Sequence, residues 1–152
     1  ELIVCDVKTY GKELRMEQYT AQLQFYAAVT GLNKAAILAF SRNLVESGRF
    51  AFRYIPISVT IEDKINAMTV AYYAQLCYDM NLLPIKPKGF RKTIECKYCH
   101  FKDRCWNDKL HNDYNDDNSN YLLNRAKEMA TKFVNEPNKR ERFLQMVKNE
   151  GQ

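Results

Sequence analysis

The chain has 152 residues and a formal net charge of +5, with 46% apolar and 12% aromatic residues. This length is typical of one domain, and the composition excludes general disorder. No apolar stretch approaches the roughly 20 residues that cross a bilayer, and no signal peptide opens the chain. These features predict a soluble, intracellular protein, cytoplasmic or nucleoid-associated, with no membrane partner.

The first half of the chain alternates strand and helix patterns. Residues 2–9 predict a strand that is buried on both faces for most of its length, and Gly11 ends it. Residues 17–29 have helical spacing with an apolar stripe that includes Tyr19, and Gly31 is a plausible stop. Residues 35–40 and 50–59 predict two strands, which the hairpin-like connection 43–48 makes antiparallel.

The second half is mainly helical. Thr60 and Asp63 form a variant capping box before a helix that extends to about residue 81. An irregular basic connection follows, and further helices are expected from 119 to 134 and from 138 to 148. The fold class is therefore α/β, a small mixed sheet flanked by helices. The expected divisions are a core at 1–95, a cysteine-rich segment at 96–106, a mobile Asn/Asp-rich loop at 107–120 and C-terminal helices at 121–152.

An acid and a lysine close the first strand. Asp6 and Lys8 project from the same face, roughly 7 Å apart along the strand. A carboxylate can hold a divalent metal, Mg²⁺ or Mn²⁺, which lowers the pKa of water, and an ammonium can stabilise charge that develops on a phosphate. The backbone carbonyl of Val7, between the two, could add a metal ligand. Alone, this triplet is weak because it occurs by chance in most proteins.

An amide and a phenol follow on the predicted helix. Gln22 and Tyr26 are four positions apart, so they lie one turn apart on one helix face. There they could orient water, contact a phosphate or hold Lys8. Taken singly, they are better explained as ordinary boundary residues of an amphipathic helix, and only the combination with Asp6 and Lys8 favours a functional role.

The cysteines predict a metal or cluster site. Cys96, Cys99 and Cys105 have the spacing C-x2-C-x5-C, and thiolates suit zinc or iron–sulfur clusters. Cys5 and Cys77 are expected to be small buried hydrophobes. Three cysteines leave a four-coordinate site open, and His100 or His111 could complete a zinc site.

A basic cluster surrounds these cysteines and could follow a phosphate backbone, although a solvated basic loop is the better explanation of the charges alone. Its members are Lys86, Lys88, Arg91, Lys92, Lys97, Lys102 and Arg104.

Together these motifs resemble the RecB-like branch of the PD-(D/E)XK nuclease superfamily. In that branch an acid–x–lysine element closes a core strand, a Q-x3-Y helix follows, and a three-cysteine group marks the iron–sulfur subset that includes AddB and CRISPR-associated nucleases. The resemblance covers roughly residues 2–106. It implies a restriction-endonuclease-like core, catalytic roles for Asp6, Lys8, Gln22 and Tyr26, and a [4Fe–4S] cluster on the three cysteines.

The family also has an acid on the preceding strand and a fourth cysteine upstream. Glu1 precedes Asp6 by an odd number of residues, so it falls on the opposite strand face. We expect the chain to be the C-terminal part of a longer nuclease. The expected function is a metal-dependent DNA nuclease, an exonuclease of DNA repair, recombination or viral DNA processing, with a helicase or recombination partner. The alternatives are a catalytically inactive DNA-binding module with structural zinc or Fe–S, and an RNA-binding zinc module.

Overall fold

A computed structural model describes residues 2–11, 13–46, 48, 52–82, 116–136, 138, 141, 142 and 145 of the chain. Its contacts divide the chain into two compact units. The first comprises Glu1–Met68 and Ala130–Gln152, and the second comprises Thr69–Met129. The candidate site lies in the first unit. Among the described residues, no helix is long and apolar enough to cross a membrane.

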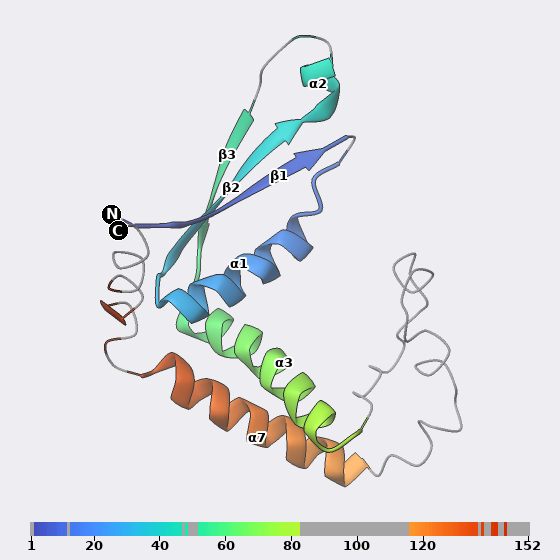
Figure 1. The fold of residues 1–152 in the computed structure, drawn as a ribbon, viewed down its shortest axis with the longest axis vertical. Coiled ribbons are helices and arrows are strands. Elements are labelled where there is room, and N and C mark those ends of the chain that lie inside the picture. The colour runs from blue at the N-terminus through green and yellow to red at the C-terminus, as the bar shows by residue number, and fades with distance from the viewer. Residues whose placement is uncertain are drawn as a thin grey trace, which may run out of the picture. The chain divides into compact units, whose positions relative to one another are not determined.

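The first unit contains a small mixed sheet of three strands in the order β1-β2-β3 (Figure 1). β1 (Val4–Tyr10) pairs in parallel with β2 (Lys34–Ser41), and β2 pairs antiparallel with β3 (Phe52–Ser58). The predicted mixed sheet and the antiparallel pair are confirmed. The expected hairpin connection also contains a short helix, α2 (Arg42–Glu46), which the sequence pattern did not indicate.

Helix α1 (Met16–Thr30) covers one face of this sheet and forms the hydrophobic core with it. Leu23 and Ala27 from the helix are fully buried together with Ile37 from the central strand. Gly31 ends the helix in the left-handed conformation, with φ 73°, which a residue without Cβ adopts freely. The predicted stop is therefore confirmed.

The opposite face of the sheet is open among the described residues, which corrects the expectation for the first strand. Cys5 is exposed and the side chain of Val7 is 60% exposed, because both project away from α1. The face of β1 toward α1 is therefore partly buried, and the opposite face is exposed among the described residues. Tyr54 on β3 lies on the same open face, as its pairing with Leu38 requires.

Helix α3 (Ile61–Asp79) begins at the predicted capping box. The backbone N–H of Asp63 donates to the hydroxyl of Thr60 at 3.1 Å, and the Thr60 N–H donates back to the Asp63 carboxylate at 2.9 Å. These reciprocal bonds satisfy two donors that a helix start leaves unpaired. Helix α7 (Asp116–Val134) begins three residues before its expected start, within the segment predicted to be a mobile loop.

Candidate active site

Asp6 and Lys8 lie side by side on the face of β1 that α1 covers. The Lys8 Nζ atom is 2.8 Å from Oδ2 of Asp6, and the side chains are 20% and 18% exposed, respectively. Strand alternation places both on this face, as the sequence predicted. Partial burial limits water around the pair, so its attraction is stronger than that of a surface ion pair.

One oxygen of the Asp6 carboxylate has no hydrogen-bond donor among the described residues. This oxygen, Oδ2, is buried and receives no hydrogen bond from the described part of the chain, although the Lys8 ammonium lies at ion-pair distance. The two observations are compatible because a hydrogen bond requires a favourable angle as well as a short distance. We therefore interpret the contact as an ion pair that leaves Oδ2 without a directed donor. A hard carboxylate oxygen of this kind suits Mg²⁺ or Mn²⁺.

Helix α1 brings the second motif to the first. Lys8 Nζ donates to Oε1 of Gln22 at 2.8 Å, across 14 residues of sequence. Gln22 Nε2 then donates to the hydroxyl oxygen of Tyr26 at 2.6 Å, one helical turn further on. Because an ammonium can only donate, Lys8 requires the oxygen of the amide to face it, and this turns the Gln22 nitrogen toward Tyr26. The four predicted catalytic residues thus form one continuous polar network.

Tyr19 is a contact that the sequence reasoning missed. Its ring centroid is 4.9 Å from Lys8 Nζ, within the distance of a cation–π interaction. The sequence pattern placed this tyrosine in the apolar stripe of the helix, and it does pack against the core. Its spacing of three residues before Gln22 could have identified it, since such residues share a helix face.

Val7, the other predicted metal ligand, lies between Asp6 and Lys8 with its side chain on the open face of the sheet. Its proposed contribution is a backbone carbonyl, and that role stays a prediction. Cys5 also projects to the open face, away from the Asp6 carboxylate, and its expected burial is wrong. Cys77 is buried as expected, and this burial raises the pKa of its thiol.

The predicted cluster ligands and the basic cluster fall outside the described residues. These are Cys96, Cys99, Cys105, Lys86, Lys88, Arg91, Lys92, Lys97, Lys102 and Arg104. Within the described ranges, no three His, Cys, Asp or Glu side chains gather into a group that could hold a metal ion. The described residues therefore supply one carboxylate of a metal site.

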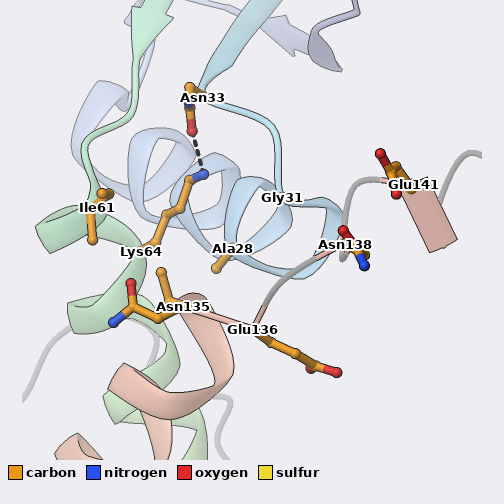
Figure 2. A pocket seen from close by; sticks show the side chains of 10 residues that line it. Ala28, Gly31, Asn33, Ile61, Lys64, Asn135, Glu136, Asn138 and Glu141 are labelled. Carbon is orange, nitrogen blue, oxygen red and sulfur yellow. Dashed lines mark hydrogen bonds between the residues drawn. The ribbon is translucent and has the colours of Figure 1, made fainter.

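A separate pocket of about 370 Å³ lies at the C-terminal end of α1 (Figure 2). Lys64 of α3 lines it and donates to Oδ1 of Asn33 at 2.6 Å. Only 5% of Lys64 is exposed, and burial lowers the pKa of its ammonium. In Figure 2 the carboxylate of Glu136 points away from this lysine. The pocket contains no member of the Asp6–Lys8 network, whose convergent polar groups make the stronger candidate site.

A scan of the chain against protein-family models finds no match, and searches of curated proteins and of solved structures find none.

Proposed function

We propose that the chain is a metal-dependent DNA nuclease domain of the RecB-like type, with a restriction-endonuclease-like core. The observation that carries the proposal is the hydrogen bond from Lys8 to Gln22, which joins the strand motif to the helix motif. Either motif alone is common. Their meeting at one ammonium supports the resemblance to RecB-like sites, in which both motifs occur.

Asp6 would hold Mg²⁺ or Mn²⁺ through its carboxylate, and the carbonyl of Val7 would be an additional ligand. When bound, the metal supplies Lewis-acid stabilisation of the phosphate and lowers the pKa of water. Lys8 places a positive charge beside the same volume, where it stabilises charge on the reacting phosphate. Gln22 orients Lys8, and Tyr26 fixes the orientation of the Gln22 amide.

Tyr26 has a second capacity in this arrangement. Its hydroxyl oxygen accepts from Gln22, so its own hydrogen is available to donate to another acceptor. The side chain is 39% exposed, which allows a phosphate oxygen to approach. Tyr26 would therefore contact the DNA backbone next to the reacting group.

The test compares cleavage by the wild-type protein, Lys8→Met and Lys34→Met on single- and double-stranded DNA with Mg²⁺, Mn²⁺ or EDTA. Lys34 is an exposed lysine at the start of β2, so its replacement controls for the loss of one positive charge. We expect cleavage that requires the divalent metal, is abolished in Lys8→Met and is retained in Lys34→Met. Metal-dependent cleavage that survives in Lys8→Met would contradict the assignment.

One observation favours the alternative of an inactive DNA-binding module. Among the three described strands the sole acidic residue is Asp6, and one carboxylate holds Mg²⁺ weakly. This alternative predicts DNA binding without cleavage at any metal concentration.

The proposed cluster on Cys96, Cys99 and Cys105 is tested separately by iron and zinc analysis and by visible absorption near ~400 nm, the region of Fe–S chromophores.

A further inference from the structure

Lys8 is held from the side of α1 by two different groups. Gln22 offers a carbonyl oxygen at 2.8 Å, and Tyr19 offers the face of its ring at 4.9 Å from the centroid. The third neighbour, Asp6, lies on β1 itself. The ammonium therefore has one strand partner and two helix partners.

We propose that Tyr19 is a positioning residue that, together with Gln22, keeps the Lys8 ammonium in place when a divalent metal occupies the Asp6 carboxylate. This inference rests on the proposed nuclease function and extends it to a residue outside the Asp-x-Lys and Gln-x3-Tyr motifs. The physical problem is competition: a metal and an ammonium are both cations, and Asp6 is the one acidic partner of Lys8 in the described structure. A metal on Asp6 weakens the strand contact of the lysine, so the helix contacts become the ones that hold it.

The Lys8 ammonium needs such positioning contacts because it lies at the end of a flexible four-carbon side chain. A single hydrogen bond donated to the amide oxygen of Gln22 leaves the Lys8 ammonium free to pivot about that oxygen. The ring of Tyr19 adds attraction from a second direction, and it does so without competing for Oε1. Since the attraction comes from the quadrupole of the ring, the tyrosine hydroxyl is dispensable for this role.

The ring-based mechanism distinguishes two substitutions. Tyr19→Phe keeps the aromatic face, whereas Tyr19→Leu keeps apolar bulk but removes the π-system. Because Tyr19 also packs against the core, a matched control is required. Tyr10 on β1 packs against the same core, so Tyr10→Leu reports the effect of losing a core aromatic without removing the ring over Lys8.

The first readout does not depend on cleavage. In protein with isotopically labelled lysine, the ε-methylene signal of Lys8 should be shifted upfield by the Tyr19 ring current, and Lys8→Met identifies this signal. We expect the upfield position in the wild type, in Tyr19→Phe and in Tyr10→Leu. Tyr19→Leu should move the signal toward that of exposed lysines. Addition of Mg²⁺ should leave the wild-type signal upfield.

The second readout is cleavage kinetics. Tyr19→Leu should lower kcat by about 3- to 30-fold, the range that loss of one cation–π contact implies, with KM nearly unchanged. Tyr19→Phe should restore kcat. An equal loss in Tyr19→Phe, an equal loss in Tyr10→Leu, or a wild-type Lys8 signal without the upfield shift would each overturn the proposal. If the wild type does not cleave DNA at all, the nuclease proposal fails, and the Lys8 signal alone decides the role of Tyr19. That role is supported if Mg²⁺ leaves the wild-type signal upfield while the Tyr19→Leu signal lies near that of exposed lysines. It is overturned if Mg²⁺ moves the wild-type signal to the position of exposed lysines.

Discussion

Gln22 connects the lysine on β1 to the tyrosine one turn further along α1, and replacing it by methionine keeps the length of the side chain while removing both polar atoms. The bond from Lys8 has a charged donor and a length of 2.8 Å. Such bonds contribute roughly 1.5–3 kcal/mol to stability. Because the Lys8 side chain is 20% exposed, water can replace part of the loss, and we expect about 1.5 kcal/mol.

The bond from Gln22 to Tyr26 should contribute less. It joins two neutral groups, and Tyr26 is 39% exposed, so its hydroxyl can bond to water instead. We therefore expect Tyr26→Phe to lower the free energy of unfolding by about 0.5 kcal/mol. The order of the two effects, Gln22→Met larger than Tyr26→Phe, follows from charge and burial.

Urea unfolding of the wild type, Lys8→Met, Gln22→Met and the double variant measures the coupling between the two side chains. A coupling energy of about 1.5 kcal/mol is expected for the pair. Gln24 provides a matched control because it lies on the same helix but donates to Asp63, at 3.1 Å. The Lys8/Gln24 cycle should give a value near zero. A Lys8/Gln22 coupling below ~0.3 kcal/mol, within the additivity error of distant sites, would refute the network.

Three further predictions concern other parts of the fold. Thr60→Ala should lower the unfolding free energy by about 1 kcal/mol at neutral pH in denaturant titrations, because it removes the hydroxyl of the capping box. Hydrogen bonds from the backbone N–H and then the hydroxyl of Thr60 hold the pKa of Asp63 below its ordinary 3.8, so this difference should shrink as the pH falls below that value. A constant difference would contradict the hydrogen bond from the Thr60 hydroxyl to the Asp63 carboxylate. Burial lowers the pKa of Lys64, so the unfolded chain binds the proton more tightly, and the stability of the wild type relative to Lys64→Met should rise as the pH increases toward the ordinary lysine value of 10.5; a flat profile would argue against the burial. In native alkylation followed by peptide mass analysis, exposed Cys5 should react much faster than buried Cys77, and equal rates would contradict the assigned strand faces.

Much of the local structure could be predicted because it depends on neighbours in the sequence. Gly31 ends α1, and Thr60 with Asp63 begins α3, through contacts that span at most a few residues. The antiparallel pairing of β2 and β3 follows from a short connection between two strand patterns. Helix α2 was missed because its five residues are too few to show a helical period.

The burial of the first strand could not be predicted, because burial depends on what covers each face. The apolar run from Leu2 to Cys5 indicated a strand with both faces covered. In the described structure α1 covers one face, and the side chains of Cys5 and Val7 are exposed on the other. An apolar run in the sequence shows that its residues favour burial, but it does not show which elements of the fold cover each face.

For the candidate site, the sequence alone determined the residue types and their local spacing. Alternation along β1 requires Asp6 and Lys8 to share a face, and the helical period requires Gln22 and Tyr26 to share another. Only the tertiary structure decided that these two faces meet, that Lys8 donates to Gln22, and that the ring of Tyr19 lies against the same ammonium. The reason is physical. Spacing within an element follows from backbone geometry. A contact between elements depends on how the helix packs on the sheet, which is decided by the core of Leu23, Ala27 and Ile37.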